Sequence, residues 1–255
     1  MGIISNLTLK EYLLENDILV GDDYFKGIRD INEKKVMEQI IIIQNAHKIL
    51  IIQNAHKILS GYNCYGTTRI NSTIGRKVEH IKVMLKRLRK DLEKRHTYKE
   101  INPMDKFILS NGNKILSKGE RGINALKEID YMGIIKRSMK KNEITLGRVD
   151  EKNLRVTSEL EIGTLKNTSY NLVEEDIYDY LKRVRIKNKK ISLEKCIDKY
   201  IEISYLSDES RDYIDILLMV PYGTLNLWYK YAYGRKEDSW QEQLKKIKLL
   251  SDSEI

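Results

Sequence analysis

Apolar residues recur at intervals of three and four along most of this 255-residue chain, which is the spacing of one face of an α-helix. Little of the sequence alternates apolar and polar residues in the way that a half-buried strand does. Only two prolines are present, which argues against a proline-rich scaffold. The sequence therefore predicts a mainly α-helical, globular fold.

The clearest amphipathic helix is expected over residues 76–96. Nine Lys and Arg residues against three acidic residues give this segment most of the chain's net charge of +9. The simplest interpretation is a solvated helix face, with five cations as the candidate partner-binding residues. The expected buried stripe is Val78, Ile81, Leu85, Leu88 and Leu92, and the candidate partner-binding cations are Lys82, Lys86, Arg87, Arg89 and Lys90.

Composition narrows the classes of protein to consider. The chain is 33% charged and basic, which permits an anionic partner without proving one. Two cysteines, Cys64 and Cys196, exclude a disulfide framework and a cysteine-based zinc site, and they suggest a reducing compartment. No stretch reaches the roughly 18–20 apolar residues of a membrane span, and no leader opens the chain. We therefore expect a soluble intracellular protein.

A tandem duplication lies inside a long helix that we expect from Glu33 onward. Residues 42–50 are repeated without change as residues 51–59. Nine residues are about two and a half helical turns, so a continuous helix would rotate the downstream residues by about half a revolution. The alternative is that one copy bulges out. Two copies are too few for a solenoid, and we interpret the repeat as a recent duplication.

The remaining segments predict further helices and a few short strands. Residues 1–32 are expected to form a short helix and a loop, and the glycine-rich residues 60–75 a loop. Asn102 followed by Pro103 is typical of a helix start. No linker is evident, so we expect a single domain. Helices are expected from 103 to about 116 and over 119–131, 176–185, 193–205, 208–220 and 240–250, and short strands over 144–146, 154–156 and 160–162.

No catalytic motif emerges from the residues themselves. The four histidines have no metal-ligand spacing, and neither a nucleophile elbow nor a glycine-rich phosphate loop is present. We therefore expect no metal site and no cofactor. Aromatic residues near the C-terminus are able in principle to stack on bases or sugars, although their apolar neighbours make them more typical of a core. They are Tyr222, Trp228, Tyr229, Tyr231, Tyr233 and Trp240.

The C-terminal third resembles a known family. The residues that carry the resemblance are Lys199-Tyr200, 206–209, 217–221, Trp228, Tyr231, Tyr233 and Trp240. Their order resembles the end of the spore-coat CotS-type proteins. These belong to the kinase-like superfamily that includes aminoglycoside phosphotransferases and choline kinases.

The resemblance implies the helical C-lobe of a protein-kinase-like fold, with a small β-hairpin near 144–165. In the superfamily a β-rich N-terminal lobe grips ATP and a larger helical lobe holds the catalytic loop. Residues 1–32 would be a remnant of the connection between lobes, around 24–27, and residues 33–255 the helical lobe. An ATP-gripping lobe of about a hundred residues has no room before Tyr24.

The catalytic loop of the resembled family usually reads His-Gly-Asp-Phe, three residues, then Asn. Residues 146–154 occupy its place, so that Gly147 and Asn153 match and Arg148 replaces the catalytic aspartate. A guanidinium cannot accept a proton at accessible pH. The metal-binding carboxylate is expected near Thr164, where no acid occurs. If the alignment is a few residues off, the substituting acids are Asp150, Glu151 and Glu161.

The resemblance and its departures together predict a catalytically inactive, CotS-type pseudokinase without a cofactor. Its role would be structural or interactive, with protein partners, in the mother-cell cytoplasm or the spore coat. One alternative is a small-molecule phosphotransferase that needs a separate N-terminal lobe. Another is a basic, helical nucleic-acid-binding protein that uses residues 76–96.

Overall fold

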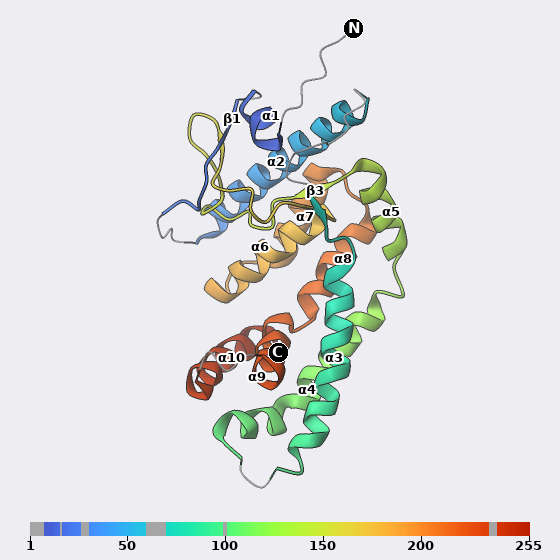
Figure 1. Cartoon of the computed structure of the whole chain (residues 1–255), viewed down its shortest axis with the longest axis vertical. Helices are drawn as coiled ribbons and strands as arrows, with labels where there is room; N and C mark the ends of the chain where they lie inside the picture. Colours follow the sequence, from blue (N-terminus) through green and yellow to red (C-terminus); the bar gives the residue numbers. More distant parts are fainter. Residues whose placement is uncertain (1–7, 16, 27–30, 60–69, 99–100, 235–238) are drawn as a thin grey trace. The chain divides into compact units, whose positions relative to one another are not determined.

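The structure is a computed structural model that describes residues 8–15, 17–26, 31–59, 70–98, 101–234 and 239–255 (Figure 1). Over these residues it contains ten helices and six short strands, which confirms the mainly α-helical prediction. In chain order they are α1 (Leu9–Glu15), β1 (Ile18–Val20), α2 (Glu33–Leu59), β2 (Asn71–Ser72), α3 (Arg76–Arg95), α4 (Pro103–Ala125), α5 (Tyr131–Lys141), β3 (Ile144–Thr145), β4 (Leu154–Val156), β5 (Leu160–Ile162), β6 (Ser169–Tyr170), α6 (Val173–Lys187), α7 (Leu193–Ser204), α8 (Asp208–Met219), α9 (Tyr222–Tyr233) and α10 (Trp240–Glu254).

The chain divides into two compact units, and each is made of two separate segments. The first unit comprises Met1–Ile74 and Tyr131–Ile214, and the second comprises Gly75–Asp130 and Asp215–Ile255. Helix α8 runs across the last of these divisions. None of the divisions falls at residue 32, so the expected separation of residues 1–32 from residues 33–255 stays a prediction.

The first unit holds two three-stranded sheets. In one, β4 and β5 form an antiparallel hairpin, and β1 pairs in parallel with β5. In the other, β6 lies between β2 in parallel and β3 in antiparallel orientation. The hairpin predicted near 144–165 is confirmed. Residues 1–32 were expected to form only a short helix and a loop, so strand β1 was not predicted. Three residues show no periodicity, and their partner strand lies more than a hundred residues away.

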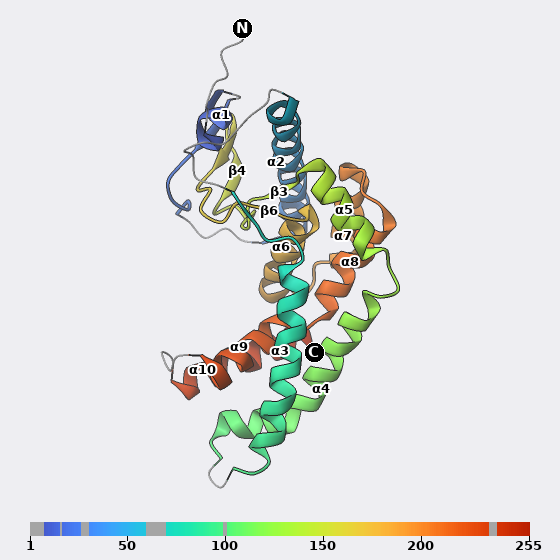
Figure 2. The same cartoon turned by 45° about the vertical axis from the view of Figure 1, so that its right-hand side comes forward.

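Helix α2 runs without a break through both copies of the nonapeptide, so the repeat continues the helix and does not bulge out (Figures 1 and 2). Its buried residues recur at three- and four-residue spacing in the first half of the helix. Gln39 is buried with them and donates from Nε2 to the carbonyl oxygens of Val149 and Leu154, at 2.7 and 2.9 Å. The buried apolar residues of this stripe are Val36, Ile40, Ile43 and Ala46.

The second unit is a cluster of helices in which α3 packs against α4 and α9, and α10 against α4 and α9. The predicted apolar stripe of α3 is buried, and Met84 joins it. Asn102 caps α4 as expected, since its Oδ1 accepts from the backbone N–H groups of Met104 and Asp105. At the other end of the unit, the buried carboxylate of Glu254 caps α9 by accepting from the N–H groups of Gly223 and Thr224.

Two helices were expected where the single helix α4 occurs, and this prediction is wrong. Gly119, where the second helix was expected to begin, and Gly122 lie inside α4 where other parts of the unit come close. A Cβ at Gly119 would lie 2.7 Å from Cδ2 of Leu85, and one at Gly122 would lie 2.5 Å from Cγ2 of Val220. Both glycines therefore permit close packing and do not end the helix.

Helices α5 and α9 were not predicted. In α9 the aromatic residues serve two roles. Trp228 is fully buried, as a core residue should be, and its indole Nε1 donates to Asp91 at 2.7 Å. Tyr233 is 46% exposed. In the part of the chain that the structure describes, no helix combines the length and apolar character that crossing a bilayer requires.

Candidate functional site

The candidate site is the loop between β3 and β4, which carries the residues aligned with a catalytic loop. Asp176, in the first turn of α6, holds the start of this loop. Its two carboxylate oxygens accept from the backbone N–H groups of Leu146 and Gly147, each at 2.8 Å. Gly147 has a φ of 70°, and a Cβ there would meet the backbone oxygen of Asn167 at 2.8 Å. Only glycine suits this position.

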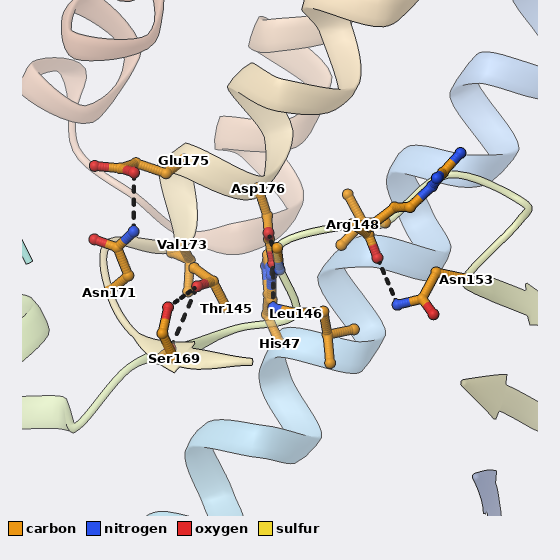
Figure 3. A network of polar contacts seen from close by, with 12 residues as sticks. His47, Thr145, Leu146, Arg148, Asn153, Ser169, Asn171, Val173, Glu175 and Asp176 are labelled. Carbon is orange, nitrogen blue, oxygen red and sulfur yellow. Dashed lines mark hydrogen bonds and ion pairs between the residues drawn. The ribbon is translucent and has the colours of Figure 1, made fainter. Parts of the chain in front are cut away.

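A buried histidine stands behind the loop and binds the same aspartate (Figure 3). Nε2 of His47, from the first copy of the repeat in α2, lies 2.9 Å from Oδ2 of Asp176. Its Nδ1 lies 3.1 Å from the hydroxyl of Tyr200 in α7. Burial raises the pKa of that hydroxyl well above its ordinary value. Helices α2, α6 and α7 are thus tied together directly beneath the loop.

Arg148 is held by an acid of its own loop. Its guanidinium donates to both carboxylate oxygens of Asp150, at 2.8 and 3.1 Å, and lies 4.8 Å from the centre of the Tyr24 ring. Arg183 of α6 adds a second cation, 3.3 Å from Oδ2 of Asp150. Burial alone would raise the pKa of Asp150, but the hydrogen bond from Arg148 and the charges of both arginines outweigh it and lower that pKa.

Asn153 and Thr164 lie side by side, as the resemblance implies for the two metal-binding positions. Oδ1 of Asn153 accepts from the backbone N–H of Thr164 at 2.9 Å, and its Nδ2 donates to the carbonyl oxygen of Arg148 at 2.8 Å (Figure 3). The amide is fully buried and bonded at both ends. Where the resemblance expects a carboxylate, Thr164 presents a hydroxyl that accepts from Lys166 N–H.

Two of the three acids considered as substitutes, Asp150 and Glu161, are paired with arginines, and the third, Glu151, is half-buried in the same loop. Asp150 binds two arginines. Glu161, in the β4–β5 hairpin, accepts from Arg155 at 2.7 Å and from the hydroxyl of Thr157, and these bonds lower its pKa. Within the described ranges, no group of three His, Cys, Asp or Glu residues is arranged to hold a metal ion.

The arrangement determines what the loop can do chemically. Divalent cations in phosphoryl-transfer sites are held by carboxylate and amide oxygens and neutralise the phosphates. At the positions aligned with the family's catalytic and metal-binding residues, the loop offers a permanent cation at Arg148 and one bonded amide at Asn153. These residues do not fit a magnesium–nucleotide site of the kinase kind. They do form a rigid, internally paired loop with a positive side chain on an aromatic ring.

No protein-family model matches the chain, and no curated protein matches it in sequence. The solved structures include a similar one, the crystal structure of an aminoglycoside phosphotransferase from Alicyclobacillus acidocaldarius, with a TM-score of 0.65 at 10% identity. The chain shares the fold of that protein.

The extent of that match is unequal for the two proteins. It covers 92% of this chain but 66% of the aminoglycoside phosphotransferase, slightly less than two thirds. The predicted kinase-like fold is confirmed at this level. The assignment to the spore-coat family stays a prediction.

The structure sets Thr164 beside Asn153. The sequence assigned Gly147, Arg148 and Asn153 to one loop by resemblance to a catalytic loop, and that assignment stays a prediction. The sequence did not link His47 to Asp176, because 129 residues separate them and no spacing rule connects them. The only available signal was that His47 shares the apolar stripe of α2.

The five predicted partner-binding cations of α3 are all exposed, but they do not act as one set. Lys82 pairs with Glu79 at 2.8 Å, and Arg89 pairs with Glu120 of α4. Arg87 instead bonds the hydroxyl of Tyr229 on α9. Lys86 and Lys90 complete the five. The five cations therefore differ in their partners, because Lys82 and Arg89 pair with carboxylates and Arg87 bonds a hydroxyl.

Proposed function

We propose that this protein is a catalytically inactive, kinase-like protein with a structural or interaction role, and that its setting is the spore coat or sporulation. The observation that carries the first part is the Arg148–Asp150 pair. A cation stands where the resemblance implies the residue that orients the acceptor hydroxyl, and it occupies the nearest carboxylate. At that position no base is present to receive the hydroxyl proton in phosphoryl transfer.

The second metal-binding position supports the same proposal. Thr164 lies beside Asn153, where a carboxylate would complete a magnesium site, and a neutral hydroxyl supplies no charge to hold the ion. Meanwhile the supports of the loop, Asp176 and His47, are buried and fully bonded. The loop has its buried supports but lacks the acids that phosphoryl transfer needs at the aligned positions. This combination favours a role in binding over a role in catalysis.

The test is stabilisation by nucleotide. We expect the midpoint of thermal unfolding to stay within about 1 °C when Mg-ATP is raised into the millimolar range, because a ligand stabilises only what it binds. Mg-ADP and magnesium alone serve as controls. A saturable rise with Mg-ATP would contradict the proposal. The double variant Arg148→Asp/Thr164→Asp, which restores both acids, shows whether those two positions alone prevent binding.

The spore-coat setting needs its own experiment, because it rests on the resemblance of the C-terminal third alone. Immunodetection in sporulating cells of the source organism, followed by extraction of the coat, should recover the protein in the coat fraction. Its presence only in vegetative cells would contradict this setting. That result would leave the inactive loop untouched.

A second candidate is a phosphotransferase that takes its nucleotide-binding lobe from a separate chain. The observation that favours it is the length of the match, since the chain covers 66% of the aminoglycoside phosphotransferase and leaves the remainder without a counterpart. Purification from the native host should then yield a complex with acceptor-dependent ATP turnover. Loss of that turnover in an Asn153→Ala variant would assign the activity to this loop, whereas unchanged turnover would assign it to the companion chain.

A further inference from the structure

One face of α3 differs from the rest of the helix because it contains no acidic residue. Its members follow each other at spacings of four and three, which keeps them on one side of the helix. All of them are exposed, and Val83 is 44% exposed. The stripe is Arg76, His80, Val83, Arg87, Lys90 and Lys94. Only two of the five cations expected from the sequence, Arg87 and Lys90, belong to it.

A row of aromatic rings borders this stripe, and we call it the ring row: Tyr222, His80, Tyr229 and Tyr233. His80 lies between two rings of α9, with centroids 6.3 Å from Tyr222 and 6.1 Å from Tyr229. Tyr229 continues to Tyr233 at 5.2 Å. The three tyrosines are spaced by seven and four residues, so they share one side of α9. The row is therefore continuous. It belongs to α3 and α9, two helices that pack within the second unit (Figure 2).

Cations lie beside the ring row, and Arg87 contacts it directly. The guanidinium of Arg87 lies 5.8 Å from the centre of Tyr229 and donates to its neutral hydroxyl, and Tyr233 donates to the carbonyl oxygen of Arg87. The charge of Arg87 is thus oriented without being neutralised. Among the described residues, Arg76 and Lys94 have no acidic partner, and they lie four residues before His80 and seven residues after Arg87 on the same side of α3.

Two of the three acids of α3 are paired away from the stripe, and the third, Glu93, is exposed. Asp91 is buried and binds Arg95 and the indole of Trp228. Glu79 pairs with Lys82 on the side of the helix away from the ring row. The stripe and the ring row together therefore form an aromatic surface with net positive charge, about 27 Å long from Arg76 to Lys94.

We propose that this surface binds single-stranded nucleic acid. Such sites combine cations that follow the phosphates with aromatic side chains on which successive bases stack. Both parts are present, in alignment, on the same two helices. In a duplex the bases are paired and stacked on one another, so they are not available to stack on the rings. An acidic protein segment would use the cations but not a row of four rings.

The test is fluorescence anisotropy with a fluorescein-labelled 15-nucleotide oligo(dT), and the same strand in a duplex as the comparison. The single strand should bind with an affinity that falls steeply with salt, and the duplex should bind at least fivefold more weakly. Equal affinity for both forms, or no binding at low salt, would overturn the proposal. This outcome is independent of whether the loop at Arg148 binds nucleotide.

Charge reversal tests which side of α3 binds the nucleic acid. The variant Arg76→Glu/Lys94→Glu should weaken binding at least tenfold and reduce the salt slope by about two. The matched control Lys82→Glu/Lys86→Glu makes the same change in charge on the other side of α3 and should change affinity less than threefold. Equal losses in the two variants would indicate attraction by net charge alone and contradict the proposal.

Ring removal tests stacking. Tyr233→Ala should weaken binding about fivefold or more, whereas Tyr233→Phe, which keeps the ring and loses the hydroxyl, should bind like the parent chain. Circular dichroism checks that each variant is folded. Binding that is insensitive to Tyr233→Ala, together with equally tight binding of poly-glutamate, would make the surface a site for acidic proteins and overturn the proposal.

Discussion

Nε2 of His47 lies 2.9 Å from Oδ2 of Asp176, and both side chains are almost completely buried. The same carboxylate binds the backbone at Leu146 and Gly147. A contact between α2 and α6 thereby sets the position of the loop that carries Arg148. The loop can be disturbed through this pair without altering any residue of the loop itself.

Replacing His47 by alanine should lower the free energy of unfolding by about 2–3 kcal/mol, because Asp176 loses a partner inside the protein and a cavity forms. Urea unfolding at pH 7 measures the change. His96→Ala, at an exposed site, is the control and should cost less than about 0.5 kcal/mol. Equal effects of the two substitutions would show that the buried pair does not stabilise the fold.

The Arg148–Asp150 pair predicts a dependence of stability on acid. Because the pKa of Asp150 is lowered from 3.8 in the folded state, the carboxylate stabilises the fold above about pH 4. That contribution disappears as the pH falls through the lowered pKa. Asp150→Asn should therefore cost on the order of 1 kcal/mol at pH 6 and progressively less below pH 4.

The measurement is urea unfolding of the parent chain and of Asp150→Asn from pH 6 to pH 3. Glu159→Gln, at an exposed position of the hairpin, should show no such convergence. A difference between parent and Asp150→Asn that stays constant with pH would argue against an ionic role for the pair.

Gly122→Ala should destabilise the second unit although alanine favours helix. The added Cβ would lie 2.5 Å from Cγ2 of Val220, a branched side chain that has little freedom to move. We expect crowding to exceed the roughly 1 kcal/mol gain in helix propensity and to leave a net loss of about 1 kcal/mol. Thermal unfolding measures it.

Gly119→Ala is the matched control for Gly122→Ala. Its Cβ would meet the flexible end of Leu85 at 2.7 Å, so a smaller effect is expected in the same helix. If Gly122→Ala were as stable as Gly119→Ala or more so, close packing at Val220 would not be the reason for this glycine.

Cys196 should be unreactive in the folded protein. Burial raises the pKa of its thiol to about 11, and the nearby charge of Glu33 adds to this. In a Cys64→Ser chain at pH 8, Ellman's reagent should react at least a hundredfold more slowly in buffer than in urea. The raised pKa also means that stability should fall above about pH 9, where only the unfolded thiol ionises. Rapid labelling in buffer would contradict the burial.

Periodicity predicted the long elements well and the short ones poorly. The stripe from Val78 to Leu92 gave α3 its correct bounds to within a residue, because five turns of amphipathic pattern leave little ambiguity. Strands of two or three residues have no such pattern, and β1 is stabilised by pairing with a distant strand. A second helix was wrongly expected to begin at Gly119. The role of this glycine depends on its packing against Leu85, which the local sequence does not show.

In the site too, local features were predicted and tertiary contacts were not. The order of residues aligned Arg148 and Asn153 with a catalytic loop, which stays a prediction, and the structure added that Arg148 binds Asp150. The contact of His47 with Asp176 and Tyr200 was outside the reach of sequence reasoning, because three helices from distant parts of the chain create it.

The repeat in α2 has a consequence for how this chain can change length. Deleting residues 42–50 or residues 51–59 produces the same polypeptide, because the two copies are identical. In that shorter polypeptide a histidine still occupies position 47, and Val36, Gln39, Ile40 and Ile43 precede it unchanged. Loss of either copy would therefore shorten α2 and leave the same residues to contact Asp176 and Tyr200 from its first half.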